Sequence, residues 1–258
     1  MSGEIYMAAA AAMAYEKRLE VVANNLANVN TAGFKRDEVD FQAYLLSDAG
    51  SALPVDPPYP DPGTAASFWI DYRSRTDFSP GPMKQTGGVT DLALNGKGFF
   101  SVQTPEGVAY TRRGNFGLDA EGVLVTQEGW PVLGESGEIR VGGGRGRGAA
   151  AGIIVGEDGT VRAGGADLGR LRIVDVAETD ALVKTGDGYF KAAGGEAAEQ
   201  PLENPRVAQG FLEMANVQTV QMMVEMIEIL RGYESYQRTM RSIDETNAKS
   251  VSELGRTG

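Results

Sequence analysis

Two stretches of the chain carry the hydrophobic periodicity of long helices. Toward the C-terminus, large apolar residues recur at alternating steps of four and three, and the series ends on a polar residue: Met222, Met226, Ile229, Tyr233, Tyr236, Met240, Ile243 and Asn247. Near the N-terminus the same alternation runs through Ile5, Ala8, Ala12, Tyr15, Leu19, Val22, Leu26 and Val29. This heptad spacing predicts two helices that each lay a narrow apolar face along a partner.

The start of the C-terminal helix is apolar on more than one face. Eight of the eleven residues from Val220 to Leu230 are apolar, so this segment needs cover on several sides. We therefore expect burial between subunits, and the alternatives are an ordinary intramolecular helix pair or an adaptable methionine-rich groove. Gly232 lies in the same helix and is expected to soften it by up to ~1 kcal/mol.

The middle of the chain has a different pattern, with short apolar runs separated by glycine-containing turns. The runs typical of strands are Leu92–Leu94, Phe99–Val102, Val123–Val125, Val132–Leu133, Ile139–Val141, Ile153–Val155 and Leu171–Val176. Many short strands at this spacing indicate an antiparallel all-β domain. The predicted fold class is thus α+β, with long heptad-patterned N- and C-terminal helices packed together and a central all-β antiparallel domain.

These patterns divide the chain into four parts. We expect an N-terminal helix in residues 1–33, a connector in 34–85, the β domain in 86–205 and a C-terminal helix in 206–258. The connector includes a stretch from Asp48 to Pro62 that is rich in proline and aspartate, followed by a short strand at Phe68–Tyr72. The stretch is interpreted as a linker, a subunit-contact loop or a plain surface loop.

Composition narrows the chemistry. The chain has no cysteine and no histidine, which excludes thiol nucleophiles, disulfides, Ser-His hydrolysis and imidazole-bound metals. A formal charge of −11 argues against nucleic acid as a partner. The tract Gly142–Gly148 matches no phosphate-binding pattern and is interpreted as a hairpin tip. We predict no catalytic residues, no cofactor and no metal. The remaining enzyme hypotheses are a Ser-Lys nucleophile and a carboxylate pair that hydrolyses glycans.

Short motifs at three places resemble one family. Residues 23–36 read A-N-N-L-A-N, two variable residues and T-A-G-F-K-R, with the motif residues Asn24, Asn25, Asn28, Thr31, Gly33, Phe34, Lys35 and Arg36. The β domain adds a D-L-A-L-N-G-K-G-F-F element and a Y-T-R-R-G-N-F element, with the motif residues Asp91, Gly96, Gly98, Phe99, Phe100, Thr111, Arg112 and Gly114. Residues 209–217 and 225–234 carry further matches. Together these elements resemble the flagellar basal-body rod and hook family. The start of the chain, S-G-E-I-Y at residues 2–6, is more similar to the proximal-rod type than to the distal-rod type.

The resemblance implies a structural subunit of the flagellar rod, required for flagellum assembly and motility, that polymerises through its terminal helices. The implied partners are other rod subunits and the flagellar type III export apparatus, and the implied location is the periplasmic rod of the basal body. No Sec-type signal and no transmembrane segment are apparent in the sequence. The arginines Arg112 and Arg113 are expected to be solvated, or else paired with carboxylates. The alternatives are a distal-rod subunit, a coiled-coil adaptor or adhesin, and a glycan hydrolase.

Overall fold

The computed structural model describes residues 2–46, 52–54, 67–141, 152–176, 181–186, 188–192, 199–202 and 204–254. Most of the proline-rich stretch at 48–62 and the whole glycine-arginine tract at 142–148 lie outside these residues. The chain divides into two compact units. The first combines residues 1–27, 37–76 and 218–258, and the second combines residues 28–36 and 77–217.

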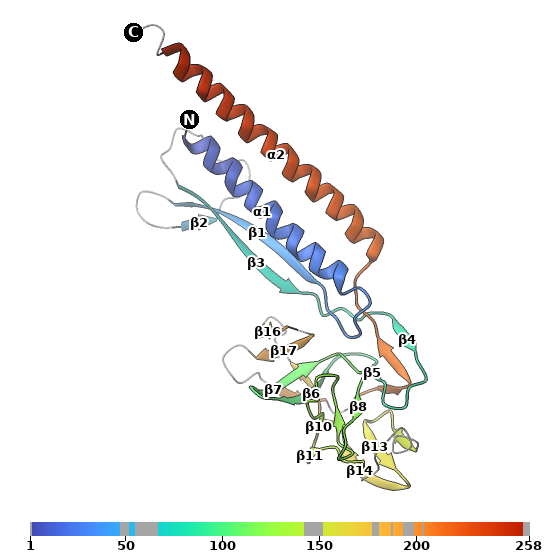
Figure 1. Cartoon of the computed structure of the whole chain (residues 1–258). Coiled ribbons are helices and arrows are strands. Elements are labelled where there is room, and N and C mark those ends of the chain that lie inside the picture. Colours follow the sequence, from blue (N-terminus) through green and yellow to red (C-terminus); the bar gives the residue numbers. More distant parts are fainter. Residues whose placement is uncertain are drawn as a thin grey trace. The chain divides into compact units, whose positions relative to one another are not determined.

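The first unit joins two helices to a small sheet (Figure 1). Its elements are α1 (Ser2–Ala27), β1 (Asp37–Leu46), β2 (Ala52–Pro54), β3 (Ser67–Thr76) and α2 (Thr219–Leu254). Helix α1 packs against α2 and also contacts β1 and β3. The sheet is antiparallel in the order β2-β1-β3, and β1 pairs with β3 from Asp37 opposite Thr76 to Leu46 opposite Ser67.

The predicted fold class is wrong for its helical part. The side chains of α1 that are fully buried include Ala12, Val22 and Asn25, and they are spread over a wider sector than a heptad seam. In α2 only Met222 and Ile229 of the predicted series are fully buried among the described residues. The physical reason is that α1 packs against two partners, α2 and the sheet strands β1 and β3, so the two helices do not pair through a single heptad seam. Strand β1 lies in the segment that was interpreted as a connector, so it was not among the predicted strands.

The second unit is built from antiparallel strands, which confirms the central all-β domain. Its largest sheet has the order β16-β17-β7-β6-β15-β18. Those strands are β6 (Phe99–Thr104), β7 (Gly107–Thr111), β15 (Ile173–Val176), β16 (Leu182–Lys184), β17 (Tyr189–Ala192) and β18 (Glu199–Pro201). A three-stranded sheet contains β12 (Ile153–Val155), β13 (Thr160–Ala163) and β14 (Ala166–Arg170).

Four strand pairs complete the unit. These are β4 (Met83–Gln85) with β20 (Phe211–Glu213), β5 (Leu92–Leu94) with β19 (Val207–Gln209), β8 (Gly117–Leu118) with β9 (Leu124–Val125), and β10 (Leu133–Gly134) with β11 (Gly137–Glu138). The pairings of β4 with β20 and of β5 with β19 bring residues 207–213 back to residues 83–94. The end of the unit is thereby tied to its beginning.

The core of the second unit lies on both faces of β6. Because side chains alternate along a strand, Phe99 and Phe100 enter different clusters. The ring of Phe100 packs edge-on against Phe116, with centroids 5.2 Å apart. Phe99 packs against Phe190 at 5.9 Å. The two adjacent phenylalanines therefore fill the core on opposite sides of the sheet.

Candidate functional site

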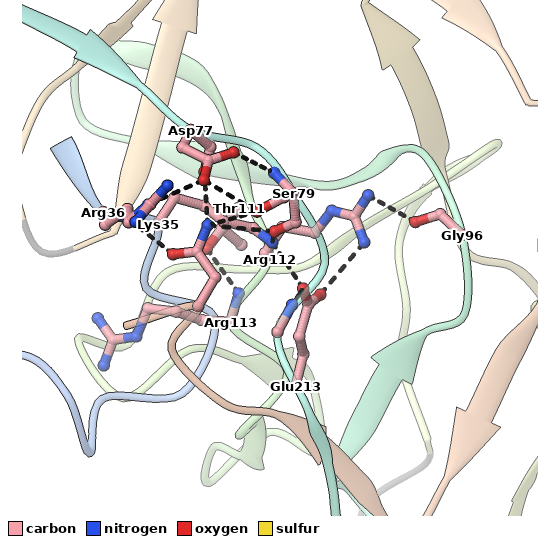
Figure 2. Close-up of polar contacts among 11 residues, drawn as sticks. Lys35, Arg36, Asp77, Ser79, Gly96, Thr111, Arg112, Arg113 and Glu213 are labelled. Carbon is pink, nitrogen blue, oxygen red and sulfur yellow. Dashed lines mark hydrogen bonds and ion pairs between the residues drawn. The ribbon is translucent and has the colours of Figure 1, made fainter. Parts of the chain in front are cut away.

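Lys35 of the N-terminal motif is completely buried in the second unit. Its Nζ donates to Glu213 Oε1 at 2.6 Å and to the carbonyl oxygen of Ser79 at 2.7 Å (Figure 2). Lys35 follows the turn that succeeds α1, and Glu213 is the last residue of β20. A buried lysine is rarely tolerated without a counter-ion, and Glu213 supplies it here. Because the two residues are 178 positions apart, their ion pair links distant segments of the unit.

Arg112, directly after β7, completes a cluster of three buried charges. Its Nη1 lies 3.2 Å from Glu213 Oε2, and its Nη2 donates to the carbonyl oxygen of Gly96 at 2.7 Å (Figure 2). The guanidinium lies over the Phe99 ring, 5.3 Å from its centroid. The backbone N–H of Gly81 also donates to Glu213 Oε1, at 3.0 Å. We call Lys35, Arg112 and Glu213 the buried charge cluster.

The electrostatics of this cluster are set by burial. Burial lowers the pKa of Lys35, the nearby Arg112 lowers it further, and the ion pair with Glu213 acts in the opposite direction. Burial likewise lowers the pKa of Arg112, against the raising effect of Glu213. Glu213 is thus the carboxylate that both buried cations contact. The expected solvation of Arg112 is wrong. Arg113, which is partly exposed, pairs with Glu128 at 2.7 Å.

A second polar group surrounds Arg36. Its Nε donates to Asp77 Oδ2 at 2.9 Å, and its backbone N–H donates to Asn216 Oδ1 at 2.8 Å. The Asn216 Nδ2 donates in turn to the Asp77 carbonyl oxygen at 2.8 Å. Burial alone would raise the pKa of Asp77, but hydrogen bonds from Ser79 and from Arg36 lower it.

Sequence reasoning missed Asp77, and it gave Glu213 and Asn216 only as members of the matched element 209–217, without their partners. Glu213 has one usable signal, since it is a carboxylate within the apolar run from Phe211 to Met214. Asp77 has no comparable signal, and the element 209–217 does not reveal what Asn216 contacts, because Arg36 lies 41 residues from Asp77 and 180 residues from Asn216 along the chain.

The other motif residues of the second unit shape turns and close contacts. Gly33 has a φ of 68°, and a Cβ there would lie 2.3 Å from the backbone nitrogen of Arg113. A Cβ on Gly114 would lie 1.5 Å from the carbonyl oxygen of Leu92. Both positions therefore require glycine. Three of the other motif residues make side-chain hydrogen bonds: Thr31 Oγ1 donates to Asn28 Oδ1, Asp91 accepts from the Thr86 hydroxyl, and the buried Thr111 hydroxyl donates to the Gly188 carbonyl oxygen. Phe34 is buried, and the Lys184 ammonium lies over its ring. Gly96 and Gly98 adopt positive φ.

In the first unit, Asn25 connects α1 to the first residue of β1. Its Nδ2 donates to the carbonyl oxygen of Asp37 at 2.7 Å, and its Oδ1 accepts from the Asp37 N–H at 2.9 Å. This paired hydrogen bond makes the side chain behave like a strand neighbour, which explains why an asparagine is buried on a helix. Asn24, beside it in the sequence, is exposed.

The predicted helix series are placed as follows. In the first series Ala12 and Val22 are buried, whereas Tyr15, Leu19, Leu26 and Val29 are half-buried, with Val29 in the turn after α1. In the second series Met222 and Ile229 are buried, and Met226, Tyr233, Tyr236, Met240 and Ile243 are half-buried. The side chains of Ile5, Ala8 and Asn247 lie outside the described residues.

Tyr15 occupies a notch on α2. Its ring packs against Tyr236, with centroids 5.5 Å apart. A Cβ on Gly232 would lie 2.5 Å from Cε1 of Tyr15. Gly232 therefore provides the room in which the tyrosine ring meets the backbone of the opposite helix.

The first three turns of α2 expose large apolar side chains on the side away from the buried Met222 and Ile229. The exposed fractions are 75% for Val220, 49% for Met223, 51% for Val224, 52% for Ile227 and 41% for Leu230. The successive steps between these residues are three, one, three and three, which places them on one face of the helix. We call them the exposed apolar face of α2. Beside it, Arg18 and Glu225 form an ion pair of 3.1 Å.

Comparison with known proteins identifies the family. Three family models match: "Flagella basal body rod protein" over residues 5–35, "Flagellar hook protein FlgE/F/G D1 domain" over 93–163, and "Flagellar basal body rod FlgEFG protein C-terminal" over 208–253. The flagellar basal-body rod protein FlgF of Caulobacter vibrioides is 36% identical over 99% of both chains. The chain belongs to the flagellar basal-body rod protein family.

Two other relatives are also flagellar basal-body rod proteins. The FlgF protein of Rhizobium meliloti is 32% identical over 99% of both chains, and the FlgG protein of Bacillus subtilis is 34% identical over 90% of this chain and 91% of its own. The predicted rod subunit of the basal body, of FlgF type, is confirmed by these matches. Within the described residues, no helix is long and apolar enough to cross a membrane.

Each of the three matched segments contributes one member of the buried charge cluster. Lys35 ends the first segment, Arg112 lies in the second and Glu213 lies in the third. In this rod protein the buried charge cluster therefore connects the three segments that the family models match. It is a structural centre, since Lys35, Arg112 and Glu213 are all buried and pair with one another.

Proposed function

We propose that this rod protein is a proximal-rod subunit that polymerises through its terminal helices. It travels to the rod through the flagellar type III export apparatus, without a cleaved Sec signal, and it has no catalytic role. Its terminal segments become fully ordered when neighbouring subunits cover them. The predicted subunit-packing series on both helices belong to this proposal. So does the division of the chain into two terminal helices of the axial core, a connector and a central β domain.

The exposed apolar face of α2 carries this proposal. Five large apolar side chains, each at least 41% exposed, lie on one stripe of about three helical turns. Scattered apolar residues are normal on a protein surface, but a contiguous stripe of this kind marks an interaction site. A helix that buries one apolar face within its own chain and exposes a second one is suited to a polymer, because the second face is covered by the next subunit.

The proposal is tested by placing a charge on that face. Val224→Glu and Ile227→Glu should abolish incorporation into purified basal bodies and swimming in soft agar, because a carboxylate would be buried in a subunit contact. Ile154→Glu is the matched control, since Ile154 is 63% exposed on β12 and receives the same change away from the helices. Normal incorporation of both helix variants would refute assembly through this face.

The position within the rod is tested separately. Quantitative mass spectrometry of basal bodies from which hook and filament have been removed should find the chain at the low copy number of a proximal component. An abundance that follows the distal rod would favour the alternative of a FlgG-type subunit, a type whose Bacillus subtilis member is 34% identical to this chain. A peptidoglycan-hydrolysis assay on the purified chain tests the absence of a catalytic role, and turnover above a buffer blank would refute it.

A further inference from the structure

Charge is unevenly distributed along α2. The segment from Thr219 to Leu230 contains two carboxylates, Glu225 and Glu228, and no lysine or arginine. The next segment, from residue 231 to residue 241, contains three arginines and one carboxylate. An acidic apolar segment is therefore followed directly by a basic segment on the same helix.

Both kinds of charge lie on one stripe of the helix surface. Val224, Glu228, Arg231, Ser235 and Arg238 follow one another at steps of four, three, four and three, and all five are exposed. This stripe also borders the groove that is lined by Val220, Val224, Glu225, Glu228 and Arg18. The opposite charges share a face that the described part of the chain leaves uncovered.

These charges are poorly compensated within the chain. Among the described residues, neither Glu228 nor Arg231 has an ion-pair partner within 4.0 Å. Arg238 lies 3.3 Å from Glu234, but the two side chains are 77% and 62% exposed. Such an exposed pair within a helix contributes little. The side chains of Glu228, Arg231 and Arg238 can therefore form ion pairs with a partner.

We propose that the partner on this stripe is a second copy of the chain, displaced along the helix axis and parallel to the first. In this arrangement the acidic apolar segment of one copy packs against the basic segment of the next, and Glu228 of one faces Arg231 and Arg238 of the other. The inference rests on the proposed assembly through α2 and specifies its partner and register. Charge complementarity favours a second copy, because one helix carries both halves of the match. The long stems of the arginines also cover apolar surface while their guanidinium groups reach the carboxylates. The contact is heterologous, so it extends along an axis instead of closing into a dimer.

Charge reversal tests this register. Glu228→Arg alone, and Arg231→Glu with Arg238→Glu, should each reduce incorporation into basal bodies at least about tenfold, because like charges then face each other. The chain that carries all three substitutions should recover incorporation, because its acidic and basic segments have exchanged places. Co-expression of the two defective chains should also recover it, because each supplies the charge that the other needs. Glu121→Arg, an equal change of charge in an exposed turn of the β domain, is the control.

The outcomes separate this inference from the proposed function. Recovery in both combinations supports contact between copies. If the reversals impair incorporation and neither combination restores it, the partner on the stripe is a different protein and the inference is wrong. If the reversals have no effect while Val224→Glu still blocks incorporation, assembly through α2 stands and the charged register is wrong. Circular dichroism of each purified variant shows whether a loss arises from misfolding, and a variant that unfolds is replaced by the neutral changes Glu228→Gln or Arg238→Gln.

Discussion

The two units of this rod protein place polar and apolar groups in opposite ways. In the second unit, Lys35 and Glu213 are completely buried and paired with each other. In the first unit, Val220 and its neighbours on α2 are apolar and largely exposed. The second unit pairs its buried charges within one chain, whereas the first unit leaves large apolar side chains exposed to solvent. We infer that the second unit folds to completion alone and that the first depends on assembly for part of its stability.

The strongest test of this contrast removes the carboxylate of the buried charge cluster. Glu213→Gln should lower the free energy of unfolding by about 3–5 kcal/mol, because it leaves two buried cations without a counter-ion. Urea denaturation of the monomer, followed by circular dichroism, measures the loss. Glu121→Gln in an exposed turn is the control and should stay within about 0.5 kcal/mol. A loss below 1 kcal/mol for Glu213→Gln would mean that the cluster does not stabilise the second unit.

A second test concerns the helix pair of the first unit. In an isolated helix Gly232→Ala would be stabilising by about 1 kcal/mol. Here the new Cβ would lie 2.5 Å from the Tyr15 ring, so we expect destabilisation by about 1–3 kcal/mol. Thermal unfolding measures the sign of the change.

A double-mutant cycle with Tyr15→Leu provides the control for the second test. The smaller side chain leaves room for the methyl group, so Gly232→Ala should be less harmful in that background. Stabilisation by Gly232→Ala in the unmodified chain would show that the tyrosine does not occupy a fixed notch.

A smaller effect is expected from the polar group around Arg36. The pKa of Asp77 is lowered below its ordinary value of 3.8, so its contribution to stability is present above pH 3.8 and is lost as the pH falls through the lower folded-state pKa. Asp77→Asn should therefore cost up to about 1 kcal/mol at pH 7 and reduce the dependence of stability on pH in the acid range. Urea midpoints between pH 2 and pH 7 measure it. An unchanged acid dependence would exclude Asp77 as the group responsible.

The smallest effect on the monomer is expected on the exposed apolar face. Val224→Glu should change the free energy of unfolding of the isolated chain by no more than about 0.5 kcal/mol, because the side chain is already half exposed. Urea denaturation, run in parallel with Glu213→Gln, measures it. A large loss would show that Val224 is buried within the monomer in solution, and the contrast between the two units would fail.

The elements that could be predicted from the sequence are those with a strong local pattern. The helices at both ends follow from periodicity, and the glycine-punctuated strands follow from short apolar runs and turn residues. The family follows from the fourteen residues 23–36 and the β-domain motifs. Strand β1 was not predicted, although Val39, Phe41 and Ala43 alternate with polar residues, because its segment was interpreted as part of the connector. Its formation depends on the pairing with β3.

The sequence by itself determined that both ends of this protein are helical, that the middle of the chain is built from short strands, and to which family the chain belongs, because these properties depend on residues close together along the chain. Only the tertiary structure decided that Lys35, Arg112 and Glu213 share one enclosed site, since Lys35 and Glu213 are 178 residues apart. The same holds for the notch at Gly232 and for the face of α2 that remains exposed. A residue's burial and its partner depend on which distant segments pack together, and no local pattern encodes that choice.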